Sequence, residues 1–573
     1  MQSRPELVEL YRPGAFAPLW LDGQRHVTDA GHDALRLLAF AHTDGLSPDD
    51  YGVAALREQA DAVQRGAATD DAGARFDVAL SASMLAYLHD LRSGRTAPRH
   101  PGVSRLATAD QELPAQLRLA AASRQVVALV RASRPRDSQY ELLSAALAQY
   151  RQAASRPLSP LTLPVATVRP GEHLADLEHL WTHLLLLGDA QPDAAAPSGD
   201  RYSGAVVDAV THFQRRHGLD PDGILGRRTM EALLIPLSWR VRQIELAMER
   251  LRLLRRHAAE ERVVIVNIPM FTLSAWETVP PSGAPAFSTR VIVGRAGKTE
   301  TPVFEAVLTE ILFRPYWNVP MSIVRTEILP TLARQPDYLE RESMELVAGE
   351  MDSSPVVPAT PQNLAQLREG HVRLRQRPGA KNALGLIKFS FPNPFDVYMH
   401  ATPARDLFAR SRRDFSHGCV RVADPVGLAA WVLTNQPPWG RDEISGAMNA
   451  PVSSRVKVER PVRVLLHYST AAVAMETGDT TFAEDIYGLD GPLDRAMRES
   501  RQALPGANAS GVDVHEVGRR VEADAAAPGA DGRLSQFREG DIGQPDVDRL
   551  PLHMQAAGCD ALGALAEHGV GLR

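Results

Sequence analysis

The chain has 573 residues, of which 44% are hydrophobic and 23% are charged, a composition typical of globular proteins. Single domains usually hold about 100 to 200 residues, so this length predicts three or four domains. A formal net charge of −6 and a pI near 6.3 provide no basic surface for nucleic acid, and no run approaches the roughly 20 apolar residues of a membrane span.

Residues 1–160 are predicted to form a helical scaffold. Apolar residues recur three and four positions apart, for example between Ala34 and Ala41 and between Val78 and Leu91. No constellation of catalytic or metal-binding residues stands out in this region. We therefore expect it to have a structural role.

A proline-rich connector leads into a compact helical unit predicted at residues 165–238. Its first helix is expected from Leu174 through Leu187. Gly218 is placed to stop a later helix, and Asp222 with Gly223 is placed to form a turn.

A third region, residues 239–496, changes from helical to strand-like periodicity. It opens with a helix predicted from Arg240 through Arg256, whose many charges are expected to form a solvated face. Residues 263–268 and 288–294 are rich in β-branched residues and predict strands. A helical, polar insertion at about 321–380 interrupts this β-rich domain.

Residues 497–573 are rich in Ala, Gly, Asp and Arg, and we expect them to form a largely disordered tail. The tail contains Cys559, one of only two cysteines in the chain. Two cysteines cannot make a disulfide framework, so the other one, Cys419, is expected to remain unpaired.

Cys419 is the best candidate for a nucleophile. It lies in the run Ser-His-Gly-Cys-Val-Arg that ends at Arg421, downstream of His400. A free thiol is only a few per cent ionised at neutral pH, so cysteine catalysis needs a neighbouring base, for which His400 and His417 are the candidates. Two alternatives stay open. Cys419 could be a small buried residue, or it could join both histidines in a zinc site, although the spacing follows no metal motif.

These motifs resemble the catalytic motif of the L,D-transpeptidases, the YkuD-type enzymes that cross-link bacterial peptidoglycan. The similarity continues into the flanking residues Gly385, Lys388-Phe389, Pro392-Asn393, Tyr398-Met399, Thr402-Pro403 and Leu407-Phe408. Residues 1–160 look like the scaffold domain of the large Gram-negative, YcbB-like branch of this family. Residues 165–238 resemble its three-helix peptidoglycan-binding module.

The resemblance implies a multidomain α+β fold. A helical scaffold at 1–160 and a peptidoglycan-binding-like module at 165–238 precede a β-rich catalytic domain at 239–496. The insertion at about 321–380 is then a capping subdomain over the active site.

The resemblance also implies roles for individual residues. Cys419 attacks the substrate, and His400 takes the thiol proton while the carbonyl of Ala401 holds its other nitrogen. Backbone N–H groups around Gly418 and Cys419, with the hydroxyl of Tyr398, stabilise the oxyanion.

His417 is a supporting residue of this catalytic loop. Arg421 either holds a substrate carboxylate or anchors the loop. The further substrate-binding candidates are Ser416, Trp317 and Asn318.

The implied reaction is an acyl transfer. The thiolate attacks the meso-diaminopimelate carbonyl of a tetrapeptide stem, releases D-alanine and passes the acyl group to an amine of another stem, giving a 3→3 cross-link. Carbapenems are expected to acylate the same thiol. Three alternatives remain: an L,D-carboxypeptidase, a lipoprotein-anchoring enzyme, and a non-catalytic wall-binding scaffold.

We expect peptidoglycan stem peptides and glycan as partners, wall-synthesis enzymes as candidate protein partners, and a monomer that uses no cofactor, metal or nucleic acid. The resemblance places the protein in the periplasm of a Gram-negative bacterium. The stretch from Met1 through Leu7 has neither the basic region nor the apolar run of a secretory signal, and we expect that the signal was removed or that the true start lies upstream.

Overall fold

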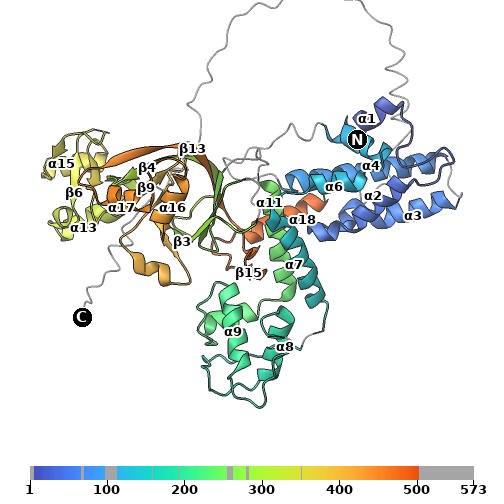
Figure 1. The fold of residues 1–573 in the computed structure, drawn as a ribbon, viewed down its shortest axis with the longest axis horizontal. Coiled ribbons are helices and arrows are strands. Elements are labelled where there is room, and N and C mark those ends of the chain that lie inside the picture. Colours follow the sequence, from blue (N-terminus) through green and yellow to red (C-terminus); the bar gives the residue numbers. More distant parts are fainter. Residues whose placement is uncertain are drawn as a thin grey trace, which may run out of the picture.

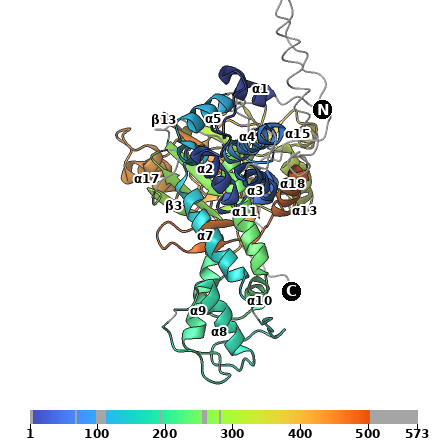
Figure 2. The ribbon, with the colours of Figure 1, turned by 90° about the vertical axis from the view of Figure 1, so that its right-hand side faces the viewer.

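The computed structural model describes residues 5–65, 70–96, 112–157, 159–191, 193–254, 262–278, 283–349 and 351–502. A helical lobe at the right of Figure 1 and a β-rich lobe at the left meet at helices α7, α11 and α18, and a small third lobe lies below that junction. The same small lobe stands apart from the others when the molecule is turned (Figure 2).

The first lobe is built from helices and short helical turns. They are α1 (Pro5–Tyr11), η1 (Arg12–Gly14), α2 (Asp29–Ala39), η2 (Ala41–Asp44), η3 (Pro48–Tyr51), α3 (Val53–Gln64), α4 (Asp70–Ser93), α5 (Leu113–Ala122), α6 (Val126–Ser133) and α7 (Ser138–Ala154). Their apolar faces form one core around the fully buried Trp20 and Phe76. The buried carboxylate of Asp77 accepts hydrogen bonds from the Trp20 N–H and the Tyr11 hydroxyl, which satisfies its oxygens inside that core.

The small lobe contains α8 (Leu177–Leu187), α9 (Ala205–Arg216) and α10 (Arg227–Leu233). Gly218, at φ 64°, follows the end of α9 as its predicted stop. The side chain of Gln214 fixes the predicted turn, because it donates to the Asp222 carboxylate at 3.0 Å and accepts from the Gly223 N–H at 2.8 Å.

The β-rich lobe is organised around a sheet in the order β11-β3-β12-β10-β9-β4-β13-β1-β2, which closes because β2 also pairs with β3. Its strands are β1 (Arg262–Asn267), β2 (Thr272–Trp276), β3 (Phe287–Gly294), β4 (Phe304–Phe313), β9 (Ile387–Ser390), β10 (Met399–His400), β11 (Asp414–Ser416), β12 (Val420–Val422) and β13 (Ser454–His467). Alternate side chains of these strands fill a single apolar core.

The remaining elements of this lobe surround the closed sheet. They are η5 (Arg405–Ala409), α16 (Pro425–Val432), α17 (Arg441–Asn449), the hairpin β14 (Ala471–Val473) and β15 (Thr480–Phe482), and α18 (Asp490–Gln502). The hairpin packs on α7 and α11, so the sheet domain reaches the helical lobe through it.

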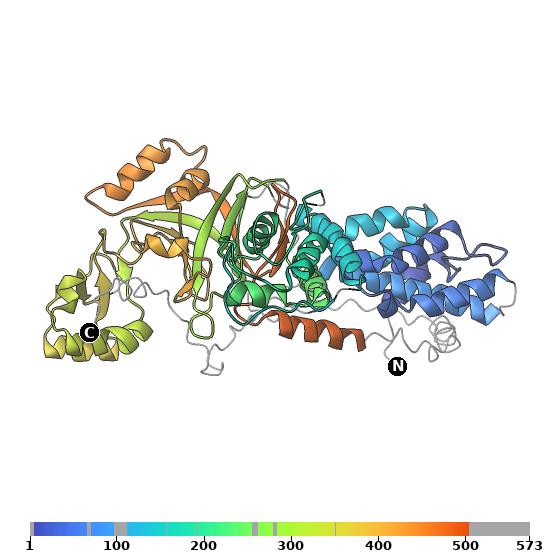
Figure 3. The ribbon, with the colours of Figure 1, turned by 90° about the horizontal axis from the view of Figure 1, so that it is seen from below.

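The predicted insertion forms a separate subdomain, which we call the cap, at residues 317–376. It contains β5 (Trp317–Asn318), α12 (Met321–Ile323), the π-helical turn η4 (Val324–Ile328), α13 (Leu329–Arg334), α14 (Tyr338–Arg341), β6 (Met344–Val347), β7 (Val356–Val357), α15 (Pro361–Glu369) and β8 (Arg373–Gln376). The helical insertion expected from the sequence thus also holds a four-stranded sheet, β5-β8-β6-β7. The cap has its own apolar core and lies at the far end of the β-rich lobe (Figure 3).

The expectation of a solvated charged face on the helix near residue 240 is wrong. This helix, α11 (Leu237–Leu253), lies at the junction, and Arg240, Arg250 and Arg252 are all buried there. Arg250 pairs with Asp490 of α18 at 2.6 Å. Sequence periodicity could not reveal this burial, because the segments that cover these arginines, such as the one with Asp490, lie far away in the sequence.

Glu249 is the centre of this buried network. Its carboxylate accepts from the backbone N–H groups of Arg95 and Thr96, at 2.6 and 3.1 Å, and pairs with Arg252 at 2.8 Å. Arg252 in turn donates to the Tyr140 hydroxyl on α7. Two parts of the helical lobe, the segment after α4 and helix α7, are thereby tied to α11.

The expected start of the disordered tail also needs correction. Helix α18 continues through residue 497 to Gln502, and Met497 is fully buried. The rest of the predicted tail lies outside the described residues. Across the described ranges, none of the helices is both long and apolar enough to cross a membrane.

We expect Glu249→Gln to lower the stability of the junction by about 3 kcal/mol, because it leaves the buried Arg252 without its countercharge. Thermal unfolding followed by circular dichroism would show this as a lower first transition. Glu231→Gln is the matched control, since its ion pair with Arg227 is exposed and contributes little. Equal melting curves for both variants would contradict a stabilising role for the network.

Candidate active site

The candidate site forms where β10 and β12 pair side by side. The two strands run parallel, with Met399 opposite Val420 and His400 opposite Arg421. Met399 and Val420 point into the apolar core, so strand alternation places His400 and Arg421 on the opposite face. This pairing brings the two halves of the predicted motif together.

His400 is held in one tautomer. Its Nδ1 lies 2.5 Å from the carbonyl oxygen of Ala401, which can only accept, so Nδ1 carries the proton and Nε2 has a free lone pair. This is the contact that the family resemblance implied. Burial, followed by the charge of Arg421, lowers the pKa of His400 to about 3, so the imidazole is neutral at pH 7.

Gly385 shapes the backbone beside this histidine. At φ 64° it passes so close to the next strand that a Cβ would lie 2.6 Å from the Cβ of Ala401. Only glycine therefore fits where the chain passes Ala401, the residue whose carbonyl orients His400.

Cys419 lies beside Tyr398, at the start of β12. The backbone N–H of Tyr398 donates to Sγ at 3.2 Å, a contact that favours a thiolate, and Sγ lies 3.9 Å from the Asp396 carbonyl oxygen. Cys419 is fully buried, and the structure records it as disulfide-bonded rather than as the unpaired thiol expected from the sequence. The thiol chemistry considered below therefore concerns the reduced side chain.

The loop before Cys419 is fixed by hydroxyl groups. Ser416 Oγ donates to the Cys419 carbonyl at 2.5 Å and accepts from the Gly418 N–H at 3.2 Å. Gly418 has φ 116°, a conformation that strongly favours glycine. The Gly418 N–H, expected to stabilise an oxyanion, is thus engaged with Ser416 in this structure.

Two threonines that the sequence analysis did not single out also hold this loop. Thr299 Oγ1 donates to the Ser416 carbonyl at 2.8 Å, and Thr301 Oγ1 donates to the Gly418 carbonyl at 2.7 Å. Nothing in their local sequence indicates this role, because they contact the loop only through tertiary structure.

The cap contacts the site at two points. His417 Nε2 lies 2.9 Å from the Glu327 carboxylate, which the π-helical turn η4 presents, and the ring of Tyr398 packs against both the cap core and the sheet core. π-Helical turns are frequent at functional sites. Because its Nε2 is engaged with Glu327, His417 is better suited to supporting the loop than to acting as the base.

The two other predicted substrate residues lie in the cap. Trp317 is fully buried in the cap core, a position for packing, whereas Asn318 is exposed on β5. Arg421 is fully buried beside His400.

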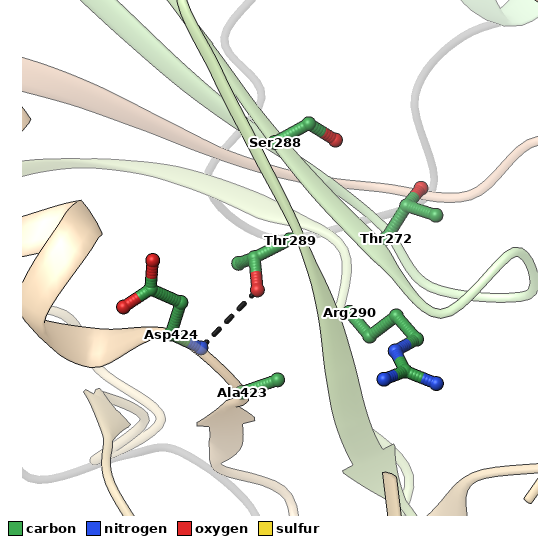
Figure 4. A pocket seen from close by; sticks show the side chains of 6 residues that line it. All are labelled: Thr272, Ser288, Thr289, Arg290, Ala423 and Asp424. Atoms are coloured by element: carbon green, nitrogen blue, oxygen red, sulfur yellow. Dashed lines mark hydrogen bonds between the residues drawn. The ribbon is translucent and has the colours of Figure 1, made fainter. Parts of the chain in front are cut away.

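A hollow of about 480 Å³ lies elsewhere on the sheet domain, at β2, β3 and the end of β12 (Figure 4). It is lined by Thr272, Ser288, Thr289, Arg290, Ala423 and Asp424. The Asp424 N–H donates to Thr289 Oγ1 at 3.2 Å across its floor. None of the predicted catalytic residues lines this hollow. The candidate active site is therefore identified from the contacts around Cys419 Sγ and not from this hollow.

Comparison with known proteins agrees with this geometry. Residues 261–458 match the family model for the L,D-transpeptidase catalytic domain, residues 5–147 match a scaffold domain, and residues 174–233 match a "putative peptidoglycan binding domain". A protein of Haemophilus influenzae named "Putative L,D-transpeptidase" is 30% identical over 237 residues, which is 41% of this chain and 45% of that protein. The alignment thus covers less than half of the relative's length.

The chain therefore carries an L,D-transpeptidase catalytic domain of the YkuD type. It combines this domain with a helical scaffold and a peptidoglycan-binding domain, which confirms the fold class expected from the sequence.

The low pKa of His400 predicts a loss of stability in acid. The folded-state pKa of about 3 lies below the value of about 6.5 in the unfolded chain, so protons bind the unfolded state preferentially. The contribution of neutral His400 to the free energy of unfolding is complete above about pH 6.5 and declines as the pH falls toward 3. At pH 5 this contribution is smaller by about 2 kcal/mol.

We expect His400→Gln to reduce the fall in melting temperature between pH 7 and pH 5. His42→Gln, which removes an exposed histidine, should melt like the unmodified protein at both values. A fall as steep for His400→Gln as for the unmodified protein would show that His400 does not titrate in this way.

Proposed function

We propose that this protein is a peptidoglycan L,D-transpeptidase that uses Cys419 as its nucleophile and forms 3→3 cross-links. The observation that carries the proposal is the pairing of β10 with β12. It brings Cys419, whose Sγ accepts from the Tyr398 N–H, next to the strand that holds His400. A neutral imidazole with an available Nε2 is the form that a general base requires.

In the first step, Nε2 of His400 takes the Cys419 proton, and the resulting thiolate attacks the meso-diaminopimelate carbonyl of a tetrapeptide stem. The carbonyl π electrons move to oxygen, which the backbone N–H of Cys419 and the Tyr398 hydroxyl stabilise. The intermediate then collapses, the C–N bond to D-alanine breaks, and the imidazolium of His400 returns its proton to the leaving nitrogen. A thioester remains on Cys419.

In the second step, the side-chain amine of another stem attacks the thioester carbonyl. His400 accepts the amine proton, the C–S bond breaks, and the sulfur regains a proton. The product is an amide between the third residues of two stems. The cap, joined to the loop through Glu327 and His417, would cover these reacting groups and exclude water, which competes with the amine as an acceptor.

The remaining features of the proposal follow from the domains. A peptidoglycan-binding domain beside the catalytic domain favours stem peptides and glycan as the ligands, and such a substrate favours a periplasmic location. The scaffold domain favours assignment to the YcbB-like branch. We expect a monomer, with wall-synthesis enzymes as candidate partners.

Cys419→Ala should abolish formation of the acyl-enzyme while the fold is retained, because no other group can form the thioester. The reduced protein is mixed with a disaccharide-tetrapeptide, and intact-protein mass spectrometry detects the tripeptide adduct. Cys559→Ala is the matched control and should keep the adduct, since it removes the other cysteine of the chain. An adduct or turnover in Cys419→Ala would exclude the proposed nucleophile.

Analysis of the released muropeptides in the same reaction identifies the acceptor. Dimers linked 3→3 support the transpeptidase. Tripeptides without dimers would indicate an L,D-carboxypeptidase or a lipoprotein-anchoring enzyme, and binding to sacculi without an adduct or product would indicate a wall-binding scaffold.

A carbapenem should acylate the reduced protein at Cys419, because opening of its strained lactam needs the same thiolate and oxyanion contacts as the stem peptide. The expected result is one added carbapenem mass, absent from Cys419→Ala, whereas most penicillins react poorly. An unchanged mass after exposure to the carbapenem would argue against this chemistry.

A further inference from the structure

Lys388 lies beside the candidate active site but has no role in the mechanism above. It belongs to β9, the strand that pairs with β10 on the side away from β12, and its register partner is His400. Residues paired across a ladder point to the same face, so Lys388, His400 and Arg421 form a row across three neighbouring strands.

The ammonium group of Lys388 packs on the ring of Tyr398. Nζ lies 3.7 Å from the ring centroid, a cation–π contact, and the same ring meets His400 edge-on at a centroid distance of 5.7 Å. The backbone N–H of Tyr398 is the group that donates to Cys419 Sγ. Lys388 is thus connected to both members of the proposed pair through one tyrosine.

No carboxylate forms an ion pair with Lys388 within 4.0 Å among the described residues. The charged groups that act on it from neighbouring segments are Asp396, Glu310, Asp352 and Arg455. Burial lowers the pKa of Lys388 to about 8, so it remains mostly cationic at pH 7. A cation that packs on the Tyr398 ring without a salt-bridge partner retains its field for other groups.

We propose that Lys388 is a positioning residue that stabilises the Cys419 thiolate, by its charge and by holding the Tyr398 ring and its backbone N–H against the sulfur. This inference rests on the proposed function, because it assumes that Cys419 reacts as a thiolate. A cation near the sulfur lowers the free energy of the ionised form relative to the thiol. The same charge also disfavours imidazolium at His400, so it helps to keep the base neutral.

The test compares Lys388→Met with Lys388→Arg. Methionine keeps an apolar stem over the Tyr398 ring but removes the charge, whereas arginine keeps both the charge and the cation–π contact. All proteins also carry Cys559→Ala, so that Cys419 is the only thiol, and are reduced and desalted before use. The rate of alkylation by iodoacetamide is then measured from pH 6 to about pH 10, where the midpoint reports the thiol pKa.

We expect the midpoint for Lys388→Met to rise by about one pH unit. Its acylation by a carbapenem at pH 7 should fall roughly tenfold and recover at high pH, where the thiol ionises without help. Lys388→Arg should keep the midpoint of the parent protein. Circular dichroism and melting curves show that each variant is folded, and Lys388→Gln replaces Lys388→Met if that variant does not fold.

An unchanged midpoint in a folded Lys388→Met or Lys388→Gln would overturn the inference. So would an equal loss of rate in Lys388→Met and Lys388→Arg at all pH values, because that pattern indicates a packing role alone. Failure of the proposed function gives a different result: the parent protein with an intact Lys388 then forms no carbapenem adduct at all.

Discussion

The candidate site depends on the parallel pairing of β10 with β12. Two short strands, separated by 19 residues between His400 and Val420, lie next to each other only because β3 and β9 flank them in the closed sheet. A shift of one residue would turn His400 toward the apolar core and Met399 toward the site. The core residues Met399 and Val420 therefore fix the register, and the register fixes the chemistry.

The surroundings of this pair restrict each group to one state. The Ala401 carbonyl selects the tautomer of His400, Gly385 allows that carbonyl its position, and Thr301 holds the backbone of the nucleophile loop. Such contacts reduce reorganisation during the reaction, which is how a preorganised site lowers a barrier. The surrounding burial serves the same end, because it removes the water that would compete for these hydrogen bonds.

The buried charges of α11 contribute to the junction between the helical lobe and the sheet domain. A chain with a separate helical lobe and sheet domain needs a junction that is specific as well as stable, and apolar packing alone is less selective of orientation. Arg250 pairs with Asp490 of α18, Arg252 pairs with Glu249 of its own helix and donates to Tyr140 of α7, and the hairpin β14–β15 completes the contact. Buried ion pairs add little net stability, but a misplaced partner is costly, so they discriminate between arrangements.

The sequence by itself determined the classes of domain and identified Cys419, His400 and the loop around Gly418, since local motifs and periodicity encode these features directly. The prediction of a solvated charged face on α11 was wrong, and no sequence motif indicated the contacts of Thr299, Thr301 and Glu327 with the nucleophile loop. Each of these side chains acts on residues more than 80 positions away, and no local pattern records such a contact. Only the tertiary structure decided which strands became neighbours, and hence the tautomer of His400 and the location of Lys388 beside Tyr398. Those properties depend on burial and charge in three dimensions.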